Sequence, residues 1–225
     1  MRLSGVTLFL LSSSVVFCQR PESGGWLSLQ LPISIYQKWQ WHNDAGYRTL
    51  GNTTAASQFL YRTGLRYSIN EHWNTAGGIA FFFTRSSFEK ANHEFGREFR
   101  TWEEINYKMN ISKPVQWLSR LRTEQRFYAA TNNHLAFTAY RFRIKLQLQQ
   151  SLSKKWGLLL ANEYMQQLAH NKLTFDQNRF IVAGVFQCDK SAQFQAGYMW
   201  LRWPAHSSQH ILTVTLQKNI LFHGK

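Results

Sequence analysis

Charged side chains at every second position are the feature of this sequence that could carry chemistry. Residues 141–145 read Arg-Phe-Arg-Ile-Lys, and residues 120–126 read Arg-Leu-Arg-Thr-Glu-Gln-Arg. Successive side chains of a β-strand point to opposite faces, so each stretch would collect its charges on one face and its apolar groups on the other. A helix would spread the same residues around its whole surface. The alternation therefore predicts strands with one charged face and one apolar face.

The same alternation, followed along the whole chain, gathers one set of charged residues on a common face. Two roles fit such a set if the strands enclose a lumen. The charges could attract an anionic solute into a narrow channel, or they could pair with one another and brace the wall. Basic residues outnumber acidic ones in the set, which consists of Arg48, Arg62, Arg66, Arg100, Glu104, Arg120, Arg122, Glu124, Arg126, Arg141, Arg143, Lys145, Glu163 and Arg179.

A hydrolytic site is an alternative hypothesis. His42 and Asp44 would share a strand face, which suits a carboxylate-oriented general base, and His93, His134 and His170 fall in or beside predicted loops. No serine is tied to these histidines by its spacing, so no catalytic residue is assigned and an enzyme is not the favoured expectation. His93 is adjacent to Glu94 rather than at a metal-ligand spacing, so neither a metal ion nor another cofactor is expected.

The composition narrows the class of partner. The 225 residues are 44% hydrophobic and 16% aromatic and carry a formal net charge of +14, yet the mean hydropathy is -0.37. A basic chain can bind nucleic acid, an anionic membrane or an anionic solute. Binding of single-stranded nucleic acid needs rings and charges on the same face, whereas here they alternate between faces. Nucleic acid is therefore not an expected partner.

The N-terminal residues 1–18 have the form of a secretory signal peptide. Arg2 precedes a short apolar stretch, and Val16 and Cys18 stand at the −3 and −1 positions before a cleavage at Gln19. Two alternatives are that Cys18 is a lipid attachment site or that the segment stays on as an anchor. After cleavage Cys188 is the remaining cysteine, so no internal disulfide is expected.

The alternating stretches predict about ten strands, an even number as in bacterial single-chain barrels. Residues 25–35 resemble a further strand broken at Pro32, which either extends the wall or forms a plug; about twelve strands is the alternative. The chain thus divides into a signal peptide (1–18), an N-terminal segment (19–36) and a barrel (37–225). The ten stretches are residues 38–49, 58–69, 73–85, 99–110, 117–130, 135–152, 156–169, 176–188, 193–203 and 209–222.

Two kinds of connection alternate between these strands. Short turns are expected at 36–39, 70–73, 111–116, 153–156 and 189–192, each ending at or followed by an aromatic residue, and longer connections at 51–57, 86–97, 131–134, 170–175 and 204–208. In outer-membrane barrels, tight turns face the periplasm and longer loops face outward.

The predicted strands are longer than the ~5–6 residues of globular strands and match the ~9–11 that cross a bilayer. Together with the export signal, this predicts an antiparallel up-and-down transmembrane β-barrel in the outer membrane, whose last strand ends at Phe222. Its expected partners are outer-membrane lipid, the barrel assembly machinery and an anionic solute. A soluble exported β-barrel that binds a small ligand remains the alternative, because its strands would alternate as well.

Short motifs give the chain a resemblance to a known family. These motifs are Gln37-Lys38-Trp39, Lys154-Lys155-Trp156, Gly64-Leu65-Arg66-Tyr67 and the Leu-Arg-x-Glu-x-Arg run of residues 121–126. On these motifs the chain resembles the Bacteroidetes outer-membrane β-barrels catalogued as domain of unknown function 2490. The resemblance covers most of the mature chain and implies a porin-like outer-membrane barrel of unassigned role, with no activity, substrate or catalytic residue to transfer.

Overall fold

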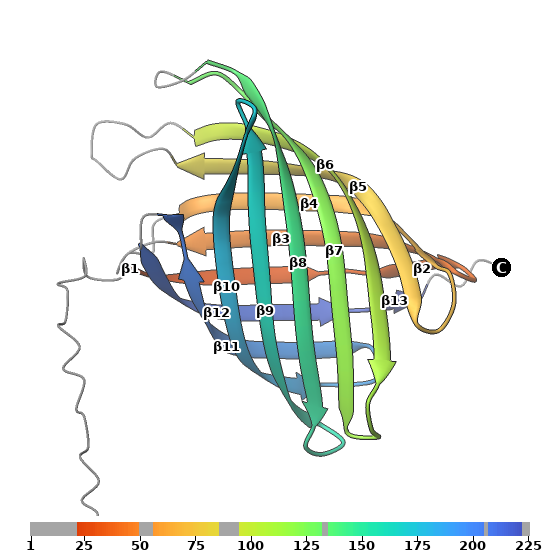
Figure 1. Cartoon of the computed structure of the whole chain (residues 1–225). Coiled ribbons are helices and arrows are strands. Elements are labelled where there is room, and N and C mark those ends of the chain that lie inside the picture. Colours follow the sequence, from red (N-terminus) through yellow and green to blue (C-terminus); the bar gives the residue numbers. More distant parts are fainter. Residues whose placement is uncertain (1–21, 50–55, 86–94, 132–134, 205–206, 222–225) are drawn as a thin grey trace, which may run out of the picture.

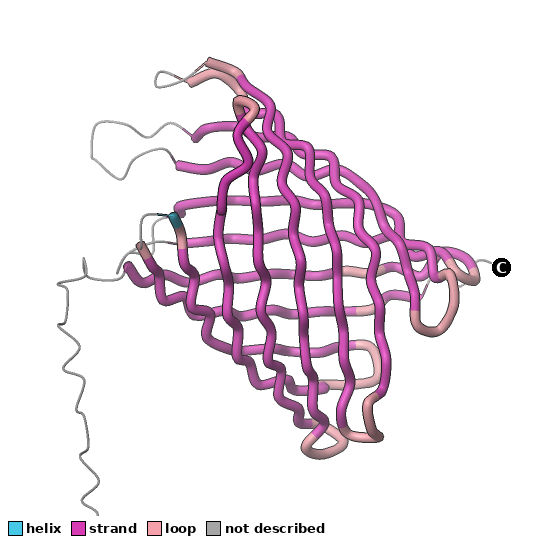
Figure 2. Tube along the Cα trace, in the orientation of Figure 1, coloured by secondary structure: helices cyan, strands magenta, loops and turns pink. Residues whose placement is uncertain are grey.

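The computed structural model describes residues 22–49, 56–85, 95–131, 135–204 and 207–221, and these form an all-β structure (Figures 1 and 2). None of the described residues belongs to a helix long and apolar enough to cross a membrane. The strands are β1 (Glu22–Gln30), β2 (Ile33–Tyr36), β3 (Trp39–Thr49), β4 (Ala56–Ser68), β5 (Trp73–Arg85), β6 (Phe95–Asn110), β7 (Val115–Tyr128), β8 (Phe137–Ser151), β9 (Trp156–Ala169), β10 (Lys172–Gln187), β11 (Ala192–Arg202), β12 (Ser208–Lys218) and β13 (Ile220–Leu221).

The sheet closes on itself through its first strand. From β3 to β12 each strand is antiparallel to the next. Strand β1 pairs antiparallel with β3 on one side and parallel with β12 on the other, so that Trp26 lies opposite both Arg48 and Thr213. The predicted closed β-barrel is therefore confirmed, and among the described strands it leaves no unpaired long edge.

The wall contains eleven strands. Residues 31–32 divide one wall strand into β1 and β2, where Pro32 lacks the N–H group that a ladder needs. The last wall strand is likewise divided into β12 and β13, and β13 pairs with β2. The stretch 25–35 thus lies in the wall. The observed number of strands, eleven, falls between the predicted numbers of ten and twelve. Because eleven is odd, the first and last strands run in the same direction, contrary to the even count expected from sequence.

One end of the barrel, here called the turn end, carries tight turns after β2, β4, β6, β8 and β10, as predicted. Side-chain oxygens hold several of them: Asn70 Oδ1 accepts hydrogen bonds from the backbone N–H groups of His72 and Trp73, at 2.9 and 2.8 Å. Asp189 Oδ1 does the same for Ser191 and Ala192, at 2.6 and 2.8 Å. Such Asx turns replace the ladder bonds that end with the strands.

The opposite end, here called the loop end, is where β1 begins and where β3, β5, β7 and β11 finish. Most of its connections fall on residues 50–55, 86–94, 132–134 and 205–206, outside the described residues, as do the signal-peptide region and Phe222. One described connection differs from its prediction. In place of a longer loop over 170–175, His170 and Asn171 form a two-residue hairpin turn with φ of 49° and 60°, which suits strands of right-handed twist.

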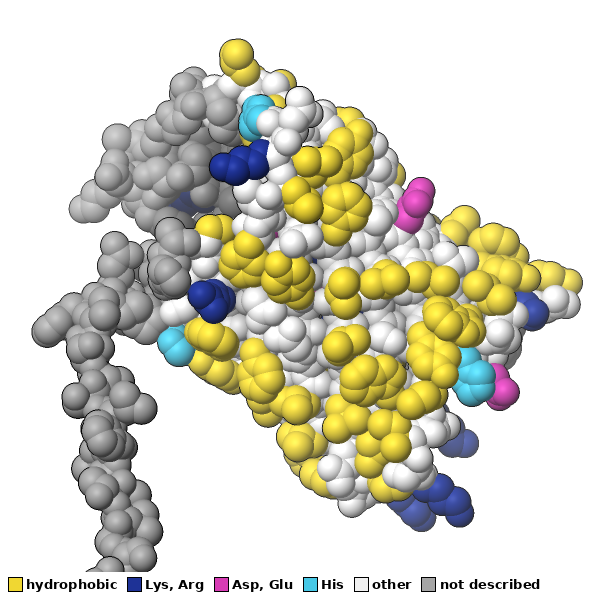
Figure 3. All heavy atoms as spheres, in the orientation of Figure 1, with side chains coloured by type: hydrophobic (Ala, Val, Ile, Leu, Met, Phe, Trp, Pro, Cys, Tyr) yellow, Lys and Arg dark blue, Asp and Glu magenta, His cyan; other side chains and the backbone are white. Residues whose placement is uncertain are grey.

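The two faces of the wall have inverted polarity compared with a soluble protein. On β8, Tyr140, Phe142 and Ile144 point outward with 45%, 45% and 48% of their surface exposed, while Arg141 and Arg143 point inward with 5% and 7%. Hydrophobic side chains cover the outward face in view, and Lys and Arg side chains lie toward its edges (Figure 3). The interior of β9 to β12 is filled by buried apolar groups such as Met165, Met199, Leu201 and Ile211.

Candidate functional site in the barrel interior

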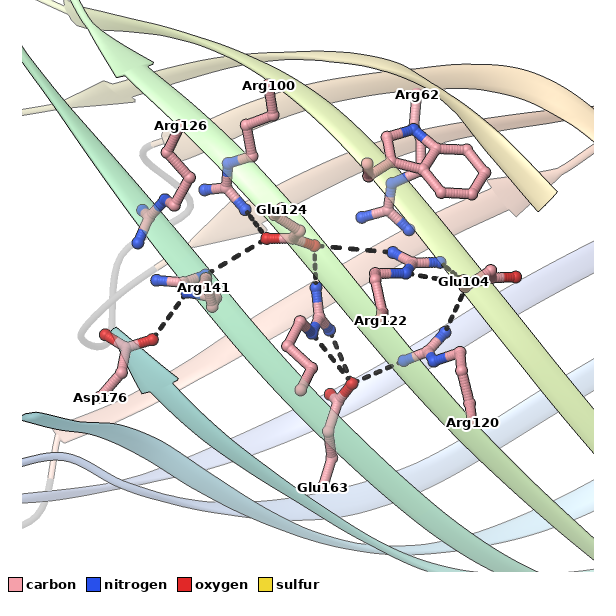
Figure 4. Close-up of polar contacts among 12 residues, drawn as sticks. Arg62, Arg100, Glu104, Arg120, Arg122, Glu124, Arg126, Arg141, Glu163 and Asp176 are labelled. Atoms are coloured by element: carbon pink, nitrogen blue, oxygen red, sulfur yellow. Dashed lines mark hydrogen bonds and ion pairs between the residues drawn. The ribbon is translucent and has the colours of Figure 1, made fainter. Parts of the chain in front are cut away.

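The inward face of the barrel brings the predicted charged set together. Every member of that set lies on the inward face, and the centre of the cluster is built by β6, β7, β8 and β9 (Figure 4). The alternation of these strands therefore places the charged side chains on one face of the wall. The function of the set stays a prediction, so its contacts are described first.

Glu124 on β7 is the hub of the cluster. Its carboxylate accepts hydrogen bonds from Arg143 Nη1 at 2.5 Å and from Arg100 Nη1 at 3.0 Å. Arg122 and Arg141 approach it at 3.7 and 3.9 Å. Only 2% of its side chain is exposed, and a carboxylate so buried needs these charged partners. Four arginines therefore depend on one glutamate.

Two further carboxylates extend the network toward the turn end. Glu104 on β6 accepts hydrogen bonds from Arg122, and Arg66 and Arg120 lie within 3.5 and 3.8 Å. Glu163 on β9 accepts hydrogen bonds from Arg143, Arg120 and Arg179 at 2.8, 2.5 and 3.4 Å. Because Arg120 and Arg143 each reach two carboxylates, the ion pairs form one connected brace across β6 to β10.

The strand register explains why these charges meet. Glu104 lies directly opposite Arg122 in the β6–β7 ladder, and Glu124 lies opposite Arg141 in the β7–β8 ladder. Lys145 lies opposite Glu163 in the β8–β9 ladder. Directly opposed side chains on one face are within contact distance. Several opposite charges are thus directly opposed across neighbouring strands, although the same ladders also place Arg100 opposite Arg126 and Arg122 opposite Arg143.

Two acidic members of the network were missed from sequence. Glu98 was left outside the predicted strand 99–110, but β6 begins at Phe95, so Glu98 lies inside the wall and accepts hydrogen bonds from Arg100 and Arg126 at 2.6 and 2.5 Å. The period-two run Glu98-x-Arg100-x-Trp102-x-Glu104 was the available signal. Asp176 is 2.8 Å from Arg141; a bulge between Phe175 and Gln177 shifts its register, which strict alternation does not predict.

Aromatic rings inside the barrel support several guanidinium groups. Arg100 lies 3.6 Å from the centroid of Phe82, and Arg122 lies 4.8 Å from that of Trp102. Trp102 has room because the inward positions opposite it on β4 and β5 are glycines: a Cβ at Gly64 would come within 2.6 Å of its ring, and one at Gly78 within 2.5 Å of Gly64 itself. Cation–π contacts partly replace the hydration that a buried arginine loses.

Two cavities with separate linings lie among the described residues of the interior. The loop-end cavity has a volume of about 230 Å³, and no Asp or Glu among the described residues lines it. The turn-end cavity, of about 390 Å³, is lined by residues that include Arg66, Arg120 and Lys145. The arginines that line the loop-end cavity are Arg48, Arg62, Arg85, Arg100, Arg126, Arg141, Arg143 and Arg179.

The ion-pair brace lies between these cavities. Along β6, Arg100 lines the loop-end cavity and Asn106 lines the turn-end cavity, with Glu104 between them. Along β7, Arg126 and Arg120 line the two cavities in the same order, with Glu124 and Arg122 between them. The carboxylates of the brace and Arg122 line neither cavity, and their side chains are 2–4% exposed. The two cavities share no lining residue.

The predicted hydrolytic arrangement does not form around His42. Its Nδ1 atom is buried without a hydrogen-bond partner, and Asp44 instead faces Arg62 at 3.6 Å. His170 lies in the hairpin turn and stacks on Phe137 with 5.5 Å between ring centroids, while His93 and His134 lie outside the described residues. Among those that the structure describes, no three His, Cys, Asp or Glu side chains form a group that could hold a metal ion.

Taken together, the fold and the interior define a class: a closed β-barrel with an apolar outer face and an ion-paired interior. Within that class, a family model described as "Protein of unknown function (DUF2490)" matches residues 23–210. The chain belongs to this family, which confirms the resemblance inferred from its short motifs. The match starts inside β1, in agreement with a wall that begins before residue 37. No curated protein matches the chain.

Proposed function

We propose that this protein is an outer-membrane β-barrel whose lumen is closed at its centre by the ion-pair brace. The observation that carries the proposal is the inverted polarity of a closed wall. Apolar side chains point outward, where lipid tails would contact them, and paired charges point inward, away from lipid. Closure satisfies the backbone hydrogen bonds of every wall strand, which a bilayer requires because it offers no alternative partners.

Aromatic side chains at both ends of the outward face support this proposal. Toward the turn end, Trp73 and Tyr107 lie with ring centroids 4.7 Å apart. Toward the loop end, Phe99 lies 5.3 Å from Phe81 and 5.8 Å from Phe127. Aromatic rings concentrate at the two membrane–water interfaces. The turn end would then face the periplasm, after export directed by residues 1–18 and insertion by the barrel assembly machinery.

The ion-pair brace favours a filled barrel over an open pore. An ion crossing the lumen would have to pass the layer formed by Glu104, Arg122, Glu124 and Glu163. These side chains are joined by ion pairs through shared arginines, and they are almost fully buried. The role that fits is a structural barrel that binds solute at one end, with anions favoured because basic groups are in excess. Permanent conduction of ions is not part of this role.

The alternatives are less well supported. A soluble exported barrel would expose a continuous apolar outer surface, which soluble proteins rarely do beyond a few hundred Å². A hydrolase would need an oriented base, and His42 contacts no carboxylate in the described interior. No specific observation favours either role.

Fractionation and electrical recording test the proposal together. Expression in a Gram-negative host should place the protein in the outer membrane, and the extracted protein should show a gel mobility that changes on heating. In planar bilayers the wild-type barrel should give no steady conductance. Recovery of the folded protein in the soluble periplasm would disprove the membrane assignment, and stable ohmic channels would disprove the closed lumen.

A further inference from the structure

The loop-end cavity differs from the turn-end cavity in the number of arginines that line it. Eight arginines line it against two in the turn-end cavity, and among the described residues neither cavity is lined by a carboxylate. The carboxylates that pair with these arginines, such as Glu98, Glu124 and Glu163, lie behind them and do not line the cavity. The cavity is therefore a small, partly open space with an excess of positive groups on its wall.

Arg48 is an arginine of this wall with neutral partners. Its Nη1 donates a hydrogen bond to Gln58 Oε1 at 2.5 Å, and Gln58 in turn donates to Thr84 Oγ1 at 2.5 Å. Its guanidinium lies 3.8 Å from the centroid of Trp26, which Arg179 also approaches at 4.9 Å. These contacts fix the orientation of Arg48 without neutralising it, which is how arginines are preorganised to receive an oxyanion.

A second donor faces the same space. Trp203 lines the cavity, and its Nε1–H group is buried without a hydrogen-bond partner. A buried donor left unpaired is unfavourable by about 1–3 kcal/mol, so such groups are commonly completed by a ligand or an ordered molecule. Trp203 directly follows β11 and Arg48 lies on β3, so the two donors reach the cavity from different parts of the wall.

We propose that the loop-end cavity is a binding site for a small polyanion, a solute that bears two or more carboxylate or phosphate groups. Arg48 and Trp203 would donate to it directly, and the paired arginines around them would supply the surrounding positive potential. The volume of about 230 Å³ is below the roughly 300–1,000 Å³ of sites for drug-sized ligands, which limits the solute to a few carbon or phosphorus centres. The site rests on the proposed function in one respect, because it requires the braced, closed barrel.

Calorimetric titration of the folded protein in zwitterionic detergent at low ionic strength tests this site. Pyrophosphate and citrate serve as probes of the phosphate and carboxylate forms of the same chemistry, and putrescine serves as a cation of similar size. We expect saturable binding of at least one polyanion and none of putrescine. We expect Arg48→Gln to weaken that binding at least tenfold, since it removes a charged donor. Arg66→Gln, the same change in the turn-end cavity, should alter it less than twofold.

Three results would overturn the site. The first is that neither polyanion binds saturably to the wild type. The second is that Arg48→Gln and Arg66→Gln weaken binding equally, which would mean that the positive charge of the whole interior attracts the anion rather than a specific site. If Arg48→Gln fails to fold, as judged by heat-modifiable mobility, Trp203→Phe replaces it. That variant removes one N–H group and should weaken binding at least threefold; unchanged affinity would also overturn the site. Bilayer conductance and fractionation test the proposed function separately, because binding in detergent requires neither.

Discussion

Arg143 on β8 bridges Glu124 on β7 and Glu163 on β9, and its bond to Glu124 is 2.5 Å long. Four buried arginines depend on the Glu124 carboxylate for an ion pair. Glu124 therefore ties neighbouring strands together. Replacing it by an uncharged group of equal size leaves these arginines buried and close to one another. Removal of one partner from a buried ion pair is far more unfavourable than replacement of the whole pair by apolar groups.

We expect Glu124→Gln to lower the free energy of unfolding by about 3–5 kcal/mol. Denaturant titration of the refolded protein in detergent measures this change. Glu103→Gln is the matched control, because Glu103 lies on the adjacent strand but on the outward face. The control should lose no stability. Similar losses in both variants would show that Glu124 is not a hub of the interior.

The assignment of faces is tested by two neighbouring positions on β8. Ile144 is the central residue of the strand and points outward, whereas Lys145 points inward beside the turn-end cavity. Arginine on a lipid-facing midplane position costs about 2–4 kcal/mol, so Ile144→Arg should sharply reduce the yield of heat-modifiable protein in the membrane. Lys145→Leu should insert nearly as well as the wild type. Equal yields from the two variants would contradict the assignment.

The parallel closure between β1 and β12 can be tested by a disulfide. Ser28 lies opposite Thr215 in this ladder. In a Cys188→Ser background, Ser28→Cys with Thr215→Cys should cross-link on mild oxidation and give a band whose mobility depends on reductant. Ser28→Cys with Thr213→Cys, which is two residues out of register, should cross-link much less. A ten-stranded barrel closed by β3 and β12 would give no cross-link in either pair.

The turn at Asp189 should contribute stability that depends on pH. Hydrogen bonds from Ser191, together with Lys218 at 3.3 Å, hold the pKa of Asp189 well below its usual range. Because the folded-state pKa is the lower one, the contribution is complete above the unfolded value of about 3.9 and is lost as the pH falls through the folded value.

The melting temperature of Asp189→Ala should therefore lie below that of the wild type at pH 7, and the difference should shrink below about pH 4. Asn70→Ala is the control, since Asn70 makes the same two turn hydrogen bonds but does not titrate. Its difference from the wild type should not narrow in that way. A constant difference for Asp189→Ala down to pH 2 would show that its carboxylate charge plays no part in the turn.

The features that could be predicted from sequence are those set by residues close together in the chain. Side-chain alternation follows from the geometry of a single strand, so Arg141, Arg143 and Lys145 could be assigned to the inward face without knowing their neighbours. The turns around Asn70 and Asp189 were equally accessible, because an Asx side chain bonds to backbone groups two and three residues away. The family resemblance rested on the same short motifs.

Features that join distant parts of the chain were decided by the tertiary structure. The bulge before Gln177 turns Asp176 toward Arg141, and the stagger between strands selects which arginine meets each carboxylate. Pairing of β1 with both β3 and β12 sets the wall at eleven strands, because closure depends on the ladder bonds that the first strand can form on both sides. The sequence by itself determined that charges share one face and apolar groups the other. Only the closed wall decided that Arg48 and Trp203 line one cavity, whose described lining includes no carboxylate, because β3 and the end of β11 come close only when the sheet curves round and joins its own edge.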